Sequence, residues 1–162
     1  MIKVSVVVTT YNRREKLLRA LESVFKQTIQ EFEIIVVDNA SNDGTQEMVK
    51  AMADPRLRYI RHDHNKGGPA ARNSGIQASC APYIALLDDD DEWYAQKLEK
   101  QLAKFQECGL DVGLVYVGSE IYDEQTSSVR TVNCPEYRGN VYERLLLSTI
   151  IGSVSSVLVK RG

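Results

Sequence analysis

The chain has 162 residues, the size of one ordinary domain, with 43% hydrophobic and 26% charged residues. This composition is typical of a folded globular domain and excludes disordered and fibrous chains. The formal net charge is −2, so no general basic field exists that would hold nucleic acid or an anionic membrane.

Strands and helices alternate through the first two thirds of the chain. Runs of β-branched and aliphatic residues predict buried strands at 4–9, 32–38, 56–61 and 83–88. Apolar residues at helical spacing predict a helix after each strand, over 12–27, 45–53, 70–78 and around 98–105. This alternation predicts an α/β fold with a mainly parallel sheet and helices on both faces.

Several helix starts carry residues that favour a helix N-terminus. Asn12, with Glu15 three positions later, resembles a capping box at the start of the first helix. Pro69 is well placed in the first turn of the third helix. Asp90 or Asp91 is expected to cap a helix that begins near residue 92.

The alternation ends after about Gly109. Residues 111–123 predict a strand and 129–134 a possible partner strand, followed by a short helix over 141–148 and one more strand over 150–162. The sequence stops directly after that strand, and we therefore expect the chain to be a fragment of a longer protein.

Polar residues follow three of the expected strands, at residues 9–11, at Asp38 and at Asp88–Asp91. The carboxyl ends of parallel strands meet at one edge of a sheet, and ligands bind outside that edge. We therefore expect these residues to form one candidate site.

The four consecutive carboxylates Asp88–Asp91 repel one another. A pair about 4 Å apart repels by ~4 kcal/mol at the effective dielectric of a protein surface. Hard oxygen ligands at a strand end suit Mg²⁺ or Mn²⁺, which take one or two carboxylates together with phosphate oxygens and water. A solvated acidic turn is the alternative, and the four residues alone do not decide between the two.

Two further segments are compatible with a ligand site. Asp38 ends the second strand, where an acid can hold a ribose or accept an N–H of a base. Asp38, Asn39 and Ser41 can equally build a local Asx-type turn. Gly67 and Gly68 precede a helix start and resemble a phosphate-cradling loop. Arg72, about one turn later, can reach a phosphate or organise the acidic cluster.

His62 and His64 flank Asp63 in a polar loop. No third residue in the sequence indicates a metal site with them, so we expect both histidines to be exposed.

The three cysteines, Cys80, Cys108 and Cys134, have no C-x-x-C spacing. An odd number of scattered cysteines is typical of free thiols in a reducing compartment. The N-terminal apolar run is too short for a signal peptide or a membrane span. We therefore expect a cytoplasmic protein.

A resemblance to a known family rests on four segments in chain order, VSVVVTTYNR, EIIVVDNASNDGT, NKGGPAARNSG and YIALLDDDDEW. Together they resemble the family 2 glycosyltransferases, which have the GT-A fold, a Rossmann-like fold of nucleotide-diphospho-sugar transferases. The resemblance is strong over about 4–93 and looser over 139–162. It implies a single GT-A domain over 1–162, truncated at its C-terminus, with a nucleotide-binding half at 1–109 and the incomplete start of an acceptor half at 110–162.

The resemblance implies a role for each matching residue. Thr9 and Tyr11 match positions that line the nucleotide base, with Tyr11 stacking on it. Asp38 matches the acid that hydrogen-bonds the base, usually uracil. Arg72 matches the basic residue near the nucleotide and its diphosphate.

The acidic segment matches the D-x-D motif of the family. Asp88 matches the position toward the ribose and metal, and Asp90 matches the direct ligand of Mn²⁺ or Mg²⁺. Asp89 lies between them and is a secondary nucleotide-binding candidate. On this interpretation, the charge that offsets the carboxylates is a divalent ion carrying the diphosphate of a nucleotide sugar.

The resemblance implies an inverting glycosyltransferase that moves a sugar from a nucleotide sugar, with a UDP-sugar expected, to a hydroxyl of a saccharide or lipid-linked acceptor. The expected setting is bacterial cell-surface polysaccharide synthesis, with peripheral membrane proximity of the full-length protein. The reaction needs a carboxylate base. The family carries it in a motif expected beyond Gly162, so the catalytic residues stay unassigned.

Two alternatives stay open at this point. A nucleotide-binding domain without turnover would bind the donor and transfer nothing. A Mg²⁺-dependent aspartyl-phosphate phosphohydrolase also places D-x-D at a strand end. In such enzymes the motif follows the first strand, whereas here it follows the fourth.

Overall fold

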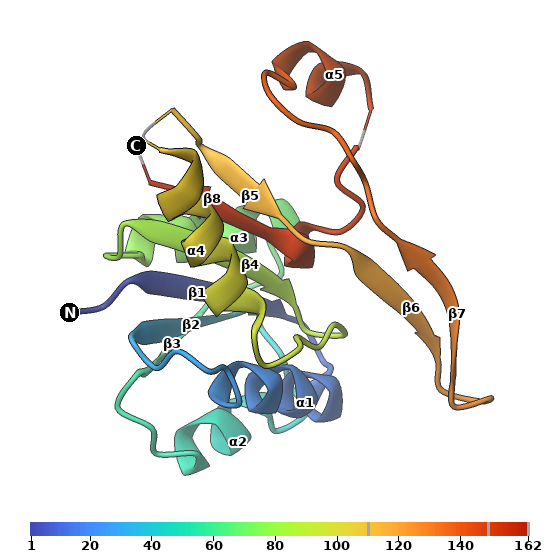
Figure 1. Cartoon of the computed structure of the whole chain (residues 1–162). Coiled ribbons are helices and arrows are strands. Elements are labelled where there is room, and N and C mark those ends of the chain that lie inside the picture. Colours follow the sequence, from blue (N-terminus) through green and yellow to red (C-terminus); the bar gives the residue numbers. More distant parts are fainter. Residues whose placement is uncertain (110, 149, 162) are drawn as a thin grey trace.

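A six-stranded sheet with the order β3-β2-β1-β4-β8-β5 organises the computed structural model, which describes residues 1–109, 111–148 and 150–161 (Figure 1). β1 to β4 run parallel, while β8 is antiparallel to both β4 and β5. The expected mainly parallel α/β sheet is confirmed. The strands are β1 (Val4–Thr10), β2 (Phe32–Asp38), β3 (Leu57–Arg61), β4 (Tyr83–Asp88), β5 (Leu114–Tyr116) and β8 (Val157–Lys160).

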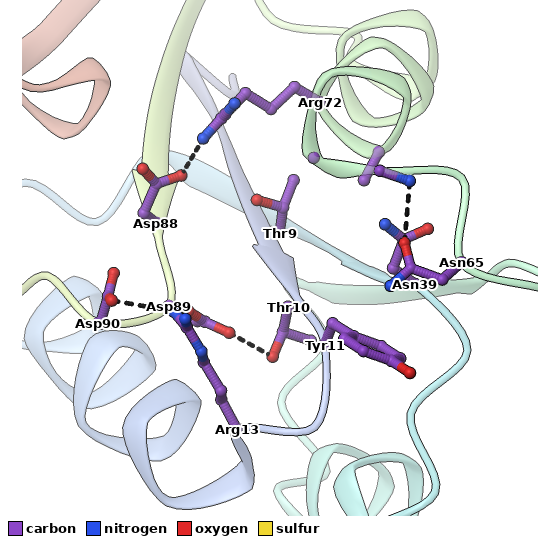
Figure 2. Close-up of a pocket in the computed structure, with 13 residues that line it drawn as sticks. Thr9, Thr10, Tyr11, Arg13, Asn39, Asn65, Arg72, Asp88, Asp89 and Asp90 are labelled. Atoms are coloured by element: carbon purple, nitrogen blue, oxygen red, sulfur yellow. Dashed lines mark hydrogen bonds and ion pairs between the residues drawn. The ribbon is translucent and has the colours of Figure 1, made fainter.

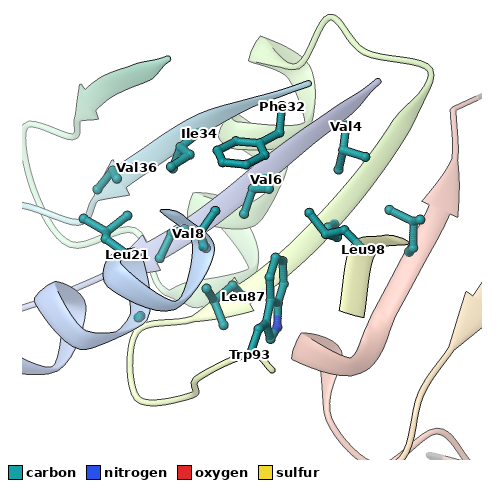
Figure 3. Packing of buried hydrophobic residues seen from close by; sticks show 14 of the residues in the cluster. Val4, Val6, Val8, Leu21, Phe32, Ile34, Val36, Leu87, Trp93 and Leu98 are labelled. Atoms are coloured by element: carbon teal, nitrogen blue, oxygen red, sulfur yellow. The ribbon is translucent and has the colours of Figure 1, made fainter. Parts of the chain in front are cut away.

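Helices cover both faces of this sheet, as the alternating pattern predicts. One face packs against α1 (Arg14–Phe25), α2 (Thr45–Ala51) and α4 (Lys97–Cys108), and the other packs against α3 (Gly68–Ala78). Figure 3 shows the larger core on the first face, where alternate residues of β1 meet side chains of the helices and Trp93. Among the helices that the structure describes, none has both the length and the apolar character that crossing a bilayer requires.

α3 packs directly against the sheet at Gly75. A Cβ added at Gly75 would overlap the side chain of Val7 on β1 and approach Val37 on β2 to 3.2 Å. The missing side chain therefore lets α3 rest directly on the two central strands. This position brings the start of α3 to the carboxyl edge of the sheet.

The order of the strands creates a switch point at the carboxyl end of β1. From β1 the chain builds outward through β2 and β3, and then crosses to the other side of β1 to form β4. Ligands of such sheets bind outside the carboxyl ends of the strands, at the point where the strand order reverses. Thr9 on β1 lies beside Asp88 on β4 in the register of this pair.

The segment after α4 differs in part from the expectation. The expected strand over 111–123 is divided into β5 and β6 (Ser119–Asp123), and β6 pairs with β7 (Ser128–Asn133). This pair and α5 (Tyr142–Leu147) extend away from the main sheet (Figure 1). The last expected strand is shorter than predicted, because a 3-10 turn at Val154–Ser156 precedes β8. Its predicted end at Gly162 lies outside the described residues.

The predicted caps of two helices are wrong, whereas Pro69 does lie in the first turn of α3. α1 begins at Arg14 without a capping side chain of its own. Instead, the Arg14 N–H donates to Asp43 at 2.9 Å, because the loop after β2 folds over the start of α1. Neither Asp90 nor Asp91 caps a helix, since the segment after them stays irregular until α4 begins at Lys97.

Candidate functional site

A cavity of about 490 Å³ opens at the switch point, a volume typical of small-molecule sites. The ends of β1 and β4 and the start of α3 surround it (Figure 2). All predicted site residues except Asp38 line it. The full lining is Thr9, Thr10, Tyr11, Arg13, Asn39, Asn65, Gly67, Gly68, Ala71, Arg72, Asp88, Asp89 and Asp90.

Arginines offset the acidic residues of the cavity in this structure. Arg72 donates to Asp88 at 2.6 Å, and Arg13 donates to Asp90 at 2.9 Å. We expected a divalent ion in this role from the sequence, and the structure shows that guanidinium groups can fill it. Asp88 and Asp90 each keep one carboxylate oxygen that has no hydrogen bond within the described residues.

Asp89 differs from its two neighbours because both of its oxygens are occupied. It is 5% exposed and accepts hydrogen bonds from the Thr10 hydroxyl at 2.7 Å and from Arg13 at 3.2 Å. Burial raises the pKa of Asp89 above its ordinary value, although these two hydrogen bonds act in the opposite direction. Asp89 therefore ties the loop after β4 to the end of β1.

The free oxygens of Asp88 and Asp90 fit a divalent cation. Mg²⁺ and Mn²⁺ prefer such hard oxygen ligands, and Mg²⁺ commonly takes only one or two carboxylates plus substrate phosphates. In the part of the chain that the structure describes, no group of three or more His, Cys, Asp or Glu side chains is arranged to hold a metal. A cation held here by Asp88 and Asp90 would need its other ligands from a bound molecule or from water.

The start of α3 forms the opposite wall from the acidic loop. Gly67 has φ +84°, a conformation that favours glycine, and its N–H donates to the side chain of Asn65 at 2.9 Å. Arg72 lies one turn into the helix, and its Nε is buried with no hydrogen-bond partner among the described residues. The guanidinium is therefore incompletely hydrogen bonded beside the cavity.

Asp38 is not among the residues that line the cavity. Its side chain is fully buried, and its carboxylate accepts from the Ser41 N–H at 2.8 Å and from the Tyr59 hydroxyl. This is the local turn that the sequence left open as an alternative. Burial and the bond to Asp38 raise the pKa of Tyr59. The next residue, Asn39, lines the cavity instead.

The expectation that His62 is exposed is wrong. His62 is 8% exposed, and its ring lies between Asn39 and Ser74, with Nδ1 2.8 Å from Asn39 Oδ1 and Nε2 3.0 Å from Ser74 Oγ. The backbone N–H of His62 donates to the backbone carbonyl of Asp38 at 2.8 Å, so the pairing of β2 and β3 continues one residue past β3. His64 is exposed, as expected.

The sequence interpretation missed several lining residues, of which Arg13 and Asn39 matter most. Arg13 stands beside Arg14 and carries no local mark that distinguishes the two. Asn39 follows Asp38, and the strand pattern does not show which of the two faces a ligand. The other missed residues are Asn65 and Ala71.

Most of this chain is similar in sequence to other proteins. Residues 5–160 match the family model described as Glycosyl transferase family 2. WcaA of Escherichia coli K12, named a putative colanic acid biosynthesis glycosyl transferase, is 34% identical over 89% of this chain and 54% of its own length. Across the curated relatives compared, the chain spans between 23% and 61% of their length.

Solved structures with this fold include complexes with nucleotide sugars. S. aureus TarS 1–349 in complex with UDP-GlcNAc is 32% identical, with a TM-score of 0.61 over 65% of this chain and 32% of that one. The mannosyltransferase PcManGT from Pyrobaculum calidifontis, in complex with GDP-Man and Mn²⁺, is 25% identical, with a TM-score of 0.64 over 76% of this chain and 36% of that one. The fold is therefore the GT-A fold, and because the family match extends over nearly all of its residues, this chain belongs to glycosyl transferase family 2.

Proposed function

We propose that this domain binds a nucleotide sugar in the cavity and that the whole protein transfers the sugar to an acceptor hydroxyl with inversion. The observation that carries the proposal is a cavity at the switch point with two chemically different sides. Figure 2 shows Asp88 and Asp90 on one side, and Tyr11, Asn39 and Asn65 on the other. The first side suits a diphosphate with its metal, and the second suits a base.

Charge balance favours a divalent cation as part of the ligand. The lining has three carboxylates, Asp88, Asp89 and Asp90, against the two guanidinium groups of Arg13 and Arg72. A diphosphate adds further negative charge, which a doubly charged ion offsets. We assign Asp88 and Asp90 to hold Mn²⁺ or Mg²⁺. When bound, the cation supplies Lewis-acid stabilisation of the departing nucleoside diphosphate.

Other lining residues receive binding roles in this proposal. Tyr11 is 45% exposed at the cavity, so its ring is available to stack on a base. Thr9 lies beside Asp88 and faces the middle of the nucleotide. Gly67 approaches the ligand with its backbone, and Arg72 orients Asp88. Asp89 keeps Thr10 and Arg13 in place rather than contacting the sugar.

The catalytic base is assigned to none of the described residues. Asp88, Asp89 and Asp90 are the only carboxylates in the cavity lining of that part of the chain. Each is bonded to an arginine, and Asp88 and Asp90 are committed to the cation in our proposal. A base must reach the acceptor hydroxyl, so another residue of the whole protein has to provide it.

The biological setting is proposed from named relatives. Besides WcaA, they include the succinoglycan biosynthesis protein ExoO and the putative teichuronic acid biosynthesis glycosyltransferase TuaG. We propose a role in polysaccharide synthesis, with a saccharide or lipid-linked acceptor and peripheral membrane proximity of the whole protein. The free thiols Cys80, Cys108 and Cys134 support a reducing, cytoplasmic location.

Calorimetric titration of UDP and of GDP, each with Mn²⁺ and again with EDTA, tests the proposal. We expect at least one nucleotide to bind with Mn²⁺ and to lose at least tenfold in affinity with EDTA, because the carboxylates then face the diphosphate directly. Equal affinity in EDTA would contradict the metal assignment. No binding of either nucleotide in Mn²⁺ would contradict the donor site itself.

A further inference from the structure

The side chain of Asn39 has a fixed orientation at the wall of the cavity. It is 4% exposed, and its Oδ1 accepts two hydrogen bonds, from the Lys66 N–H at 2.9 Å and from His62 Nδ1 at 2.8 Å. A backbone N–H can only donate, so the atom that faces Lys66 must be the oxygen. Two donors occupy both lone pairs of that oxygen, which can accept nothing further.

The amide nitrogen of Asn39 is therefore left for a ligand. Asn39 Nδ2 has no hydrogen-bond partner within ranges 1–109, 111–148 and 150–161, and it is not sealed inside the protein. The only unpartnered side-chain nitrogen or oxygen fully buried there is Nε of Arg72. Because Asn39 lines the cavity, its two N–H donors are available to a bound molecule.

His62 holds this arrangement from outside the cavity. Its ring is fixed on one side by Asn39 and on the other by the hydroxyl of Ser74, which also lies 3.1 Å from the carbonyl of Ala70 in α3. Nδ1 must carry a proton to donate to Asn39. It carries one in the charged ring and in the neutral tautomer that is protonated at Nδ1. The imidazole does not line the cavity itself.

We propose that His62 is a positioning residue that makes Asn39 a hydrogen-bond donor to the nucleotide base. The site then recognises the base through an accepting atom, a carbonyl oxygen or a ring nitrogen, and not through an N–H. This inference rests on the proposed function. Asn39 lies on the side of the cavity with Tyr11, away from the acidic loop that would take the diphosphate (Figure 2).

Calorimetry on Asn39 variants tests the direction of this hydrogen bond. Asn39→Asp keeps the shape of the side chain and removes its N–H donors. Asn39→Ala removes the shape and the donors together. With Mn²⁺ and the tighter of UDP and GDP, we expect Asn39→Asp to lose about 5- to 10-fold in affinity, at least as much as Asn39→Ala. Tighter binding by Asn39→Asp would overturn the inference, because the base would then be presenting an N–H.

A double-mutant cycle tests whether His62 acts through Asn39. We expect His62→Ala to weaken binding about 3- to 10-fold alone and less than 2-fold when added to Asn39→Ala. If His62→Ala lowers the affinity equally in the unaltered chain and in Asn39→Ala, the role of His62 is merely structural and the inference is overturned. His62→Gln can still donate an N–H and should recover part of the affinity, and it also serves if His62→Ala fails to fold. His64→Ala is the matched control.

The two proposals fail in distinguishable ways. If the unaltered chain binds neither UDP nor GDP with Mn²⁺, the proposed function fails and takes this inference with it. If the unaltered chain binds and either variant test gives the contrary result, only the role of His62 and Asn39 is overturned.

Discussion

Both ends of the parallel strands hold carboxylates, and those at the carboxyl end line the cavity. At the amino end, Glu33 of β2 is 4% exposed and accepts from the Ser5 hydroxyl at 2.6 Å, the Cys80 N–H at 3.0 Å and Arg58 at 3.2 Å. At the carboxyl end, Asp88 and Asp90 each have one ion pair and one oxygen without a partner in the described structure.

The difference separates a carboxylate whose hydrogen bonds hold the fold together from two carboxylates that each keep one oxygen free at the cavity. Burial opposes ionisation of Glu33, yet hydrogen bonds from Cys80 and Ser5 outweigh it and lower the pKa of Glu33. Both of its oxygens accept hydrogen bonds from β1, β3 or the loop after α3, so neither is left for a ligand. At the carboxyl end, Asp89 is similar to Glu33, because both of its oxygens accept hydrogen bonds. Its neighbours Asp88 and Asp90 each keep one free oxygen in the described structure.

The largest expected effect is that of Asp90→Ala on nucleotide binding. Asp90 has a free oxygen at the cavity and is exposed, so we expect loss of a metal ligand without loss of stability. Affinity for the nucleotide with Mn²⁺ should fall at least about 100-fold, about 2.8 kcal/mol. Asp91→Ala is the matched control, because Asp91 does not line the cavity. Unchanged calorimetric affinity in Asp90→Ala would contradict the assignment.

Glu33→Ala should have the opposite effect to Asp90→Ala, a loss of stability without a loss of nucleotide affinity. Removing this carboxylate leaves the Ser5 hydroxyl and the Cys80 N–H without their partner. We expect the free energy of unfolding in urea to fall by about 2–3 kcal/mol. Nucleotide affinity should stay the same. Glu31→Ala, at an exposed ion pair with Lys3, should change stability by less than about 1 kcal/mol. A loss of binding in Glu33→Ala would remove the distinction between the two ends.

Lys97 provides a smaller, pH-dependent test with a buried cation. Its Nζ meets only neutral groups in the described chain, Gln101 Oε1 at 2.9 Å and the Trp93 ring at 3.8 Å, and burial lowers the pKa of Lys97 to about 7. Above that pH the unfolded chain binds more protons than the folded one, so stability should rise with pH until about 10.4.

The expected size is at most about 1.4 kcal/mol per pH unit. Lys97→Met should remove this contribution, so the informative quantity is the difference between the unaltered chain and the variant in urea unfolding from pH 7 to 9. Parallel pH profiles for the two proteins would show that Lys97 keeps its charge inside the fold through its neutral neighbours.

Much of the fold follows from local sequence. β2 and β4 have the predicted bounds, because their apolar runs end abruptly at Asp38 and Asp88. The helix starts were harder to predict. Capping depends on backbone donors and on which loop lies nearby, and at α1 the donor Arg14 finds Asp43 from the loop after β2 rather than Asn12 from its own turn.

The sequence by itself determined that Thr9, Tyr11 and the Asp88–Asp90 segment share one edge of the sheet, because polar residues that end neighbouring parallel strands must meet there. Only the tertiary structure decided how each side chain is used. Arg13 meets Asp89 across 76 positions of sequence, and His62 meets Asn39 across 23. Hydrogen bonding depends on distance and direction between atoms, and strand pairing and the close packing of α3 set both.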